Sequence, residues 1–207
     1  MSRYTLPKCR LCRRDGVKLF LKGARCLMAK CPIEKRSKPP GMHAFRRRRP
    51  TAYGIRLREK QKLRRFYGVS EAQFRRYFEM ARKYKGNTGE ALLAIMERRL
   101  DNVLKAAGFA LSRSHARQLV RHGRIQVNGR KVNVPSFQVK QGDVVRPEPT
   151  EAMAAMVRAC RDDQGNPKPA WLDINETDLT ARVVRLPLRA DISATVEEGL
   201  VVEFCSR

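Results

Sequence analysis

Positive charge is concentrated in the first third of this chain, and this uneven distribution limits how that part can fold. Residues 1–66 contain 22 lysines and arginines and only 3 acidic residues, whereas the remaining 141 residues contain 23 basic and 17 acidic residues. Such an excess repels itself in a compact state. The first third should therefore need a polyanionic partner, while the rest can form ordinary cores. Nucleic acid is the partner that a net charge of +25 predicts, and charge that serves only solubility is the alternative.

Four cysteines stand in this basic segment as two close pairs. Cys9 and Cys12 are separated by two residues, and Cys26 and Cys31 by four, with thirteen residues between the pairs. Two such pairs can bring four thiolates to the corners of a tetrahedron, which suits a structural Zn²⁺. An iron–sulfur cluster also takes four cysteines, His43 could replace one ligand, and chance placement is the alternative to any metal. Because the segment lacks an obvious core, a metal could supply its folding energy.

Helical signals dominate the next stretch, from about residue 51 to residue 107. Ser70, with Gln73 three positions later, is a capping-box pattern that starts a helix. The apolar face that follows has helical spacing and consists of Phe74, Tyr77, Phe78 and Ala81. After a stop at Gly86, a second apolar face ends at Gly108. Its residues are Leu92, Leu93, Met96, Leu100, Val103 and Leu104.

A third helix and a hairpin are expected next. Ser112 should cap this helix and Gly123 should end it, with Ala116, Leu119 and Val120 on its apolar side. Two alternating runs then meet at Asn128 and Gly129, a strong hairpin signal because a type I′ turn needs positive φ at both positions. Further strands are predicted at 144–145, 171–174 and 182–186. Before the last two strands, a helical apolar face comprises Met153, Met156, Val157 and Cys160.

Two groups of cations are candidate contacts for a polyanion. The first follows the third helix into the hairpin and comprises Arg113, Arg117, Arg121, Arg124, Arg130 and Lys131. The second surrounds most of one helix and comprises Arg56, Arg58, Lys60, Lys62, Arg64 and Arg65. Only Glu59 interrupts the second group, so we expect a polyanion to cover part of that helix and stabilise it. Tyr53 and Tyr67 flank it and could stack on bases or belong to a core.

Solvated helix faces are the alternative for both groups of cations. No recognition helix with regularly spaced base-reading side chains is evident. A scattered basic coat therefore favours a folded RNA read by its shape over DNA.

Several motifs resemble a known family. The segments 98–103, 112–123 and 127–132 are similar to the small RNA-binding module named after the fourth small-subunit ribosomal protein. Some tRNA synthetases, pseudouridine synthases and heat-shock proteins also carry this module. The flanking segments resemble the bacterial-type ribosomal family itself, so that the resemblance covers essentially the whole chain; they are 3–4, 7–14, 18–23, 57–62, 85–89 and 201–204. Two departures are Cys205, where the family usually has Tyr, and a variant loop at 161–170.

The resemblance implies an α+β fold. A metal-stabilised N-terminal segment (1–42) is expected to precede a basic helical domain (43–96), which the C-terminal segment (191–207) rejoins so that 200–204 pack there. An inserted α/β RNA-binding domain (97–190) should contain a helix pair, β-hairpins and an antiparallel sheet. Its core module covers about 97–147.

The resemblance also implies a function. Family members are cytoplasmic, bind 16S ribosomal RNA early at a multi-helix junction, and help to nucleate assembly of the subunit body. They lie beside the third and fifth small-subunit proteins, near the place where messenger RNA enters, and influence decoding accuracy. The residues lining that place correspond here to Arg46, Arg47 and Arg49. The residues expected at ribosomal RNA are Arg10, Arg13, Arg14, Lys22, Tyr53, Arg56, Arg58, Lys60, Lys62, Arg64, Arg65, Lys83, Lys85, Ser112, Arg113, Arg117, Gln118, Arg121, His122, Arg124, Arg130 and Lys131.

Two other functions compete with the ribosomal one. An RNA-modifying enzyme with the same module would need a separate catalytic domain, and no paired catalytic carboxylates or Gly-rich phosphate loop are evident. A free-standing RNA chaperone would use the same binding chemistry, so the sequence leaves it open. A membrane partner is not expected, because no apolar run approaches the roughly 20 residues that span a bilayer.

Overall fold

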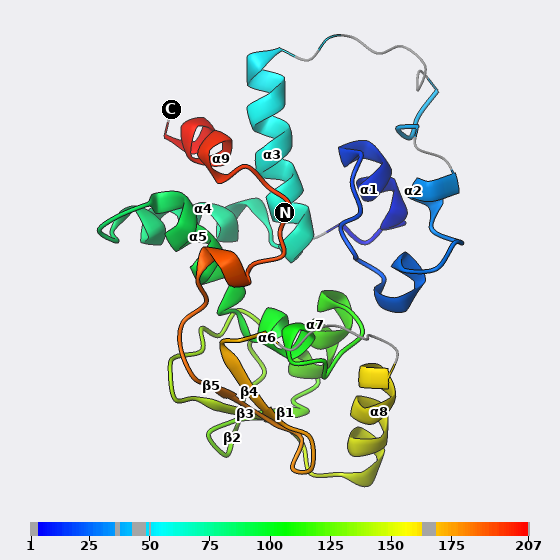
Figure 1. Cartoon of the computed structure of the whole chain (residues 1–207), viewed down its shortest axis with the longest axis vertical. Coiled ribbons are helices and arrows are strands. Elements are labelled where there is room, and N and C mark those ends of the chain that lie inside the picture. The colour runs from blue at the N-terminus through cyan, green and yellow to red at the C-terminus, as the bar shows by residue number, and fades with distance from the viewer. Residues whose placement is uncertain (1–3, 36–37, 43–48, 50, 163–168, 207) are drawn as a thin grey trace. The chain divides into compact units, whose positions relative to one another are not determined.

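The computed structural model describes residues 4–35, 38–42, 49, 51–162 and 169–206, and Figure 1 shows its helices and its sheet. Their mixture of helices with an antiparallel sheet confirms the predicted α+β class. The chain divides into two compact units, Met1–Leu92 with Ala194–Arg207, and Leu93–Ser193. Among the described residues, no helix combines the length and the apolar character needed to cross a bilayer. The three-part division expected from the sequence stays a prediction.

The first unit begins with short helices around the paired cysteines. They are α1 (Cys9–Asp15), a 3₁₀ turn η1 (Gly23–Cys26) and α2 (Pro32–Lys35). Gly16 ends α1 with a φ of 73°, a left-handed conformation that favours glycine. The buried apolar side chains of this segment are Cys12, Leu19, Cys26 and Cys31. Three of the four are cysteines, so the core of this segment is very small.

Three longer helices follow: α3 (Ala52–Tyr67), α4 (Glu71–Arg82) and α5 (Thr88–Glu97). The Ser70 hydroxyl accepts a hydrogen bond from the backbone N–H of Gln73 at 3.4 Å, which confirms the predicted start of α4. The predicted apolar face of α4 is also confirmed, because Phe74, Tyr77, Phe78 and Ala81 are buried. The C-terminal helix α9 (Glu198–Cys205) packs against α3 with Val201 fully buried, as Figure 1 shows.

The second predicted apolar face is divided between two helices. After α5 the chain is extended at Arg99, with φ −66° and ψ 136°, and α6 (Leu100–Ala106) begins at the next residue. The interruption has a tertiary cause: the Leu100 N–H donates to the Phe137 carbonyl at 2.9 Å, and the Val139 N–H donates to the Arg98 carbonyl at 3.0 Å. Pairing with this distant segment replaces helical hydrogen bonds, which periodicity alone does not reveal.

The second unit surrounds a five-stranded antiparallel sheet of order β2-β1-β3-β5-β4. The strands are β1 (Ile125–Val127), β2 (Arg130–Lys131), β3 (Val144–Pro147), β4 (Leu172–Asn175) and β5 (Thr180–Val183). Asn128 and Gly129 have φ of 50° and 77°, which confirms the predicted hairpin turn. The predicted strand at 182–186 is shifted, since β5 starts earlier and the chain beyond Val183 leaves the sheet, with Val184 and Leu186 exposed.

One hydrophobic core joins this sheet to three helices. Residues of α6, of α7 (Arg113–Arg121) and of α8 (Glu151–Asp162) pack with one face of the strands around the fully buried Trp171. Cys160 of α8 is buried, as predicted for a core position. This shared core therefore fixes α7 and the hairpin of β1 and β2 against the rest of the unit.

Candidate RNA interface and cysteine cluster

Helix α7 carries its cations beside its buried face, with Arg113 and Arg117 half-buried and Arg121 exposed. The Ser112 hydroxyl accepts a hydrogen bond from the His115 backbone N–H at 3.3 Å, which confirms the predicted cap and explains why Ser112 itself is buried. The buried side consists of Ala116, Leu119 and Val120. Arg113, Arg117 and Arg121 recur every fourth residue and so follow one another along the helix.

The three arginines of this stripe differ in their surroundings. The Arg113 Nε donates to the Asn102 Oδ1 at 2.7 Å, and the Arg117 Nη1 lies 3.6 Å from the Asp101 Oδ2. Arg121 is exposed. Arg113 is thus hydrogen bonded to a buried residue of α6, Arg117 lies beside another, and Arg121 faces solvent.

Exposed polar and basic residues continue the stripe into the hairpin. They are Gln118, His122, Arg124, Arg130 and Lys131. Lys131 has an acidic neighbour at the edge of this surface, because its Nζ lies 3.8 Å from a Glu148 carboxylate oxygen. We call residues 112–131 the α7–hairpin surface. Its predicted basic residues therefore lie on one helix and on the hairpin that directly follows it.

Lys105 of α6 is a functional candidate that sequence reasoning missed. Burial lowers the pKa of its ammonium group to about 8, and the nearby positive charge of Arg113 contributes. Lys105 is half-buried beside a second cation, with Glu97 as the nearby acid that opposes the shift. The sequence offered no signal for it, since Lys105 lies near Arg113 only after α6 and α7 pack together.

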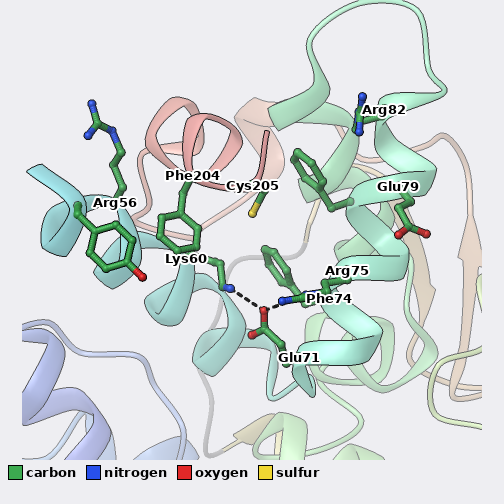
Figure 2. Close-up of a pocket in the computed structure, with 11 residues that line it drawn as sticks. Arg56, Lys60, Glu71, Phe74, Arg75, Glu79, Arg82, Phe204 and Cys205 are labelled. Atoms are coloured by element: carbon green, nitrogen blue, oxygen red, sulfur yellow. Dashed lines mark hydrogen bonds and ion pairs between the residues drawn. The ribbon is translucent and has the colours of Figure 1, made fainter. Parts of the chain in front are cut away.

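Helix α3 uses its cations differently, because acids from elsewhere in the unit pair with them. The Lys60 Nζ lies 2.5 Å from the Glu71 carboxylate, as Figure 2 shows, and Arg64 lies 2.6 Å from the same group. Burial raises the pKa of the Glu71 carboxyl, but the hydrogen bonds from Lys60 and Arg64 outweigh it and hold the pKa below its usual value.

Two further pairs follow this pattern, and a third lies within α3 itself. Arg56 lies 2.6 Å from Glu203 of α9, Lys62 lies 2.9 Å from Glu59, and Arg65 pairs with the buried Asp15 of α1. Acids that folding brings to α3, which the sequence count near the helix omitted, therefore offset part of its charge, and the expectation that a polyanion covers this helix stays a prediction. Arg58 is exposed.

The two tyrosines beside α3 have separate environments. Tyr67 is buried and belongs to the core, whereas Tyr53 is 63% exposed, with its ring centroid 5.5 Å from that of Phe204. A hollow of about 460 Å³ lies beside this ring pair, between α3, α4 and α9 (Figure 2). Aromatic rings and charged groups line it together, among them Phe74, Arg75 and Arg82.

The remaining predicted contacts are spread over the surface. The exposed residues among them are Arg10, Arg14, Lys22, Lys83, Lys85 and Arg49. Arg13 is half-buried and its Nε donates to the Lys38 carbonyl at 2.9 Å. Arg46, Arg47 and His43 lie outside the described residues.

The four paired cysteines lie within electrostatic reach of one another. Burial raises the pKa of the Cys12 thiol, and Cys26, Cys9 and Cys31 raise it further, while a backbone hydrogen bond from Leu19 opposes them. A backbone hydrogen bond from Lys22 acts in the same way at Cys26. All four are free thiols, and across the described ranges no three Cys, His, Asp or Glu side chains are arranged to hold a metal ion.

Comparison with known proteins identifies the family. Residues 3–97 match the family described as Ribosomal protein S4/S9 N-terminal domain, and residues 98–145 match the S4 domain. The chain is 55% identical over 207 residues to small ribosomal subunit protein uS4A of Symbiobacterium thermophilum. It is 53% identical over 208 residues to uS4 of Dictyoglomus turgidum and 51% identical over 209 residues to uS4 of Acidobacterium capsulatum, with full coverage of both chains in each case. The chain therefore belongs to the uS4 family of small ribosomal subunit proteins.

Proposed function

We propose that this chain is a structural constituent of the small ribosomal subunit and binds 16S ribosomal RNA through the α7–hairpin surface. The uS4 family is not enzymatic, so the function is binding. The observation that carries the proposal is the row of basic side chains from Arg113 to Lys131, mounted on a buried core inside the S4 domain. Guanidinium groups match phosphate oxygens in charge and geometry.

Charge reversal tests this surface. Replacing Arg113, Arg117 and Arg121 with glutamate should abolish tight binding of the full chain to 16S ribosomal RNA at about 0.1 M salt. The matched control reverses three exposed arginines elsewhere in the same unit, Arg146, Arg158 and Arg182, and should weaken binding far less. Unchanged affinity in the first variant would reject the α7–hairpin surface.

The place of the protein in the cell follows from the same proposal. We infer that it resides in the cytoplasm within the small subunit, contributes to early assembly at an RNA junction, and lies near the path of the messenger with the third and fifth small-subunit proteins as neighbours. The family resemblance supports these finer statements. Of the three arginines expected at the messenger contact, Arg49 is the one that the structure describes, and it is exposed. A tagged chain that sediments mainly apart from small subunits would favour a free-standing RNA chaperone.

We also propose that Cys9, Cys12, Cys26 and Cys31 hold a structural Zn²⁺, with an iron–sulfur cluster as the alternative. Burial of three of the four thiols, and backbone N–H groups directed at two of the sulfurs, suit thiolate ligands. A metal bound there would link segments that share only a very small core.

Metal analysis of the purified chain tests the cysteine site. About one Zn²⁺ per chain is expected, whereas iron with visible absorbance would select the cluster. Cys26→Ser should abolish metal binding. Cys160→Ser, at a buried cysteine of the other unit, is the matched control and should retain the metal. A metal-free wild-type chain that keeps its N-terminal fold would reject the site.

A further inference from the structure

Helix α6 carries polar side chains where a core helix would ordinarily carry apolar ones. Asp101 is 3% exposed and Asn102 is 1% exposed, in a helix whose Leu100, Val103 and Leu104 join the hydrophobic core. Buried polar groups are costly unless they are hydrogen bonded. The partners of these two residues therefore indicate what they do.

The amide of Asn102 is fixed in one orientation. Its Nδ2 donates to the Glu97 carbonyl at 3.2 Å and also to the Glu97 carboxylate. Both donors of the amide thus face Glu97, and the Oδ1 is left to accept the bond from the Arg113 Nε at 2.7 Å. This bond gives the guanidinium group a fixed acceptor, whose own orientation is set by Glu97.

The carboxylate of Asp101 has a related arrangement. Its two oxygens accept a forked pair of hydrogen bonds from the buried Arg99, at 2.9 and 2.5 Å. The Arg117 Nη1 lies farther away, at 3.6 Å. The hydrogen bonds that hold this carboxylate are therefore made with Arg99. Arg117 lies near enough to be attracted by its negative charge.

We propose that Asn102 is a positioning residue, which holds the guanidinium group of Arg113 in a fixed direction for contact with RNA phosphates. This inference rests on the proposed binding of 16S ribosomal RNA. Ordering an arginine before it meets its ligand removes part of the conformational cost of binding.

A double-mutant cycle on the full chain tests the contact between Asn102 and Arg113. Arg113→Ala should weaken binding to 16S ribosomal RNA about tenfold, and Asn102→Ala should weaken it about three- to tenfold, the cost of ordering one side chain. In the Arg113→Ala background, Asn102→Ala should cause no further loss, because Asn102 acts only through that arginine. Val103→Ala, at a fully buried position of the same helix, is the matched control and should lower stability without changing affinity.

A second variant keeps the test valid if Asn102→Ala fails to fold. Arg113→Lys retains the charge at a half-buried position but cannot offer both an Nε to Asn102 and further guanidinium donors to phosphate. It should weaken binding nearly as much as Arg113→Ala, and wild-type affinity in this variant would overturn the inference.

If Arg113→Ala itself binds like wild type, the proposed interface is wrong at this residue and the inference falls with it. If Arg113→Ala weakens binding but the two losses add in full, the interface stands and the positioning role is rejected.

Discussion

Helices α3 and α7 are both rich in cations, yet their charges have different neighbours. On α3, Lys60 and Arg64 face Glu71, while Arg56 and Arg65 face Glu203 and Asp15. On α7, Arg113 donates to the amide of Asn102, Arg117 lies 3.6 Å from the Asp101 carboxylate, and Arg121 is exposed. A run of basic residues is therefore a poor measure of available positive surface, because tertiary neighbours decide how much of the charge is offset.

The difference also separates stability from binding. Cations that face buried or half-buried carboxylates hold elements of the first unit together, since removing one leaves an uncompensated charge. Exposed cations of the α7–hairpin surface contribute little to the stability of the fold and remain available to contact phosphates. Substitutions in the two helices should therefore change different measurements.

The largest effect is expected from the exposed cations that follow α7. Replacing Arg121, Arg124 and Arg130 with glutamine should lower affinity for 16S ribosomal RNA on the order of 100-fold, because about three phosphate contacts are lost. The slope of log affinity against log salt should fall by about 2 to 3. Filter binding across a salt series measures both, and thermal unfolding should be nearly unchanged. A large loss of stability in this variant would contradict the comparison.

A smaller effect, on stability, is expected from the contact between α3 and α1. Arg65→Met removes the partner of Asp15, whose side chain is 3% exposed, so unfolding should become easier by about 2 to 3 kcal/mol. Chemical denaturation measures this change. Arg58→Met, at an exposed position of the same helix, is the matched control and should change stability by less than about 0.5 kcal/mol. Equal effects of the two substitutions would show that the pairing on α3 is unimportant.

Glu71 should make the first unit sensitive to acid. Because its folded pKa lies below the usual 4.5, its contribution to stability is complete at neutral pH and is lost as the pH falls from about 4.5 through the folded value. Glu71→Gln should therefore cost about 1 to 2 kcal/mol at pH 7 and flatten the loss of stability in acid. Denaturation at pH 7 and pH 3 tests this, with the exposed Glu79→Gln as control. An unchanged acid profile would exclude Glu71 as the cause.

The smallest effect is expected at Lys105. Its pKa is about 8 in the folded chain against an ordinary 10.5, so the unfolded chain binds more protons between these values and stability should rise as the pH increases from 8 to 10.5. Lys105→Met should raise stability at pH 7 by about 1 kcal/mol and remove that rise. Denaturation at pH 7 and pH 9.5 measures it, with the exposed Lys140→Met as control. A variant that keeps the rise would show that another group titrates.

Short-range patterns determined much of the fold. The sequence by itself predicted α4 and its cap at Ser70, the start of α7 at Ser112 and the hairpin at Asn128 and Gly129, and the structure confirms each. These features depend on hydrogen bonds and φ angles within a few residues, so local residue types are sufficient to specify them. The uS4 family could also be read from the sequence, because its motifs extend along the whole chain.

Only the tertiary structure decided which residues meet across long distances in the chain. The break between α5 and α6, the acids that surround α3, and the contact of Asn102 with Arg113 all depend on segments that pack together after folding. Electrostatic and hydrogen-bonding energies depend on separation in space, and periodicity in one segment carries no information about it. The sequence therefore determined that the chain is basic and where several of its elements begin, while the fold decided where the helix after α4 is interrupted and which charges face acids or solvent.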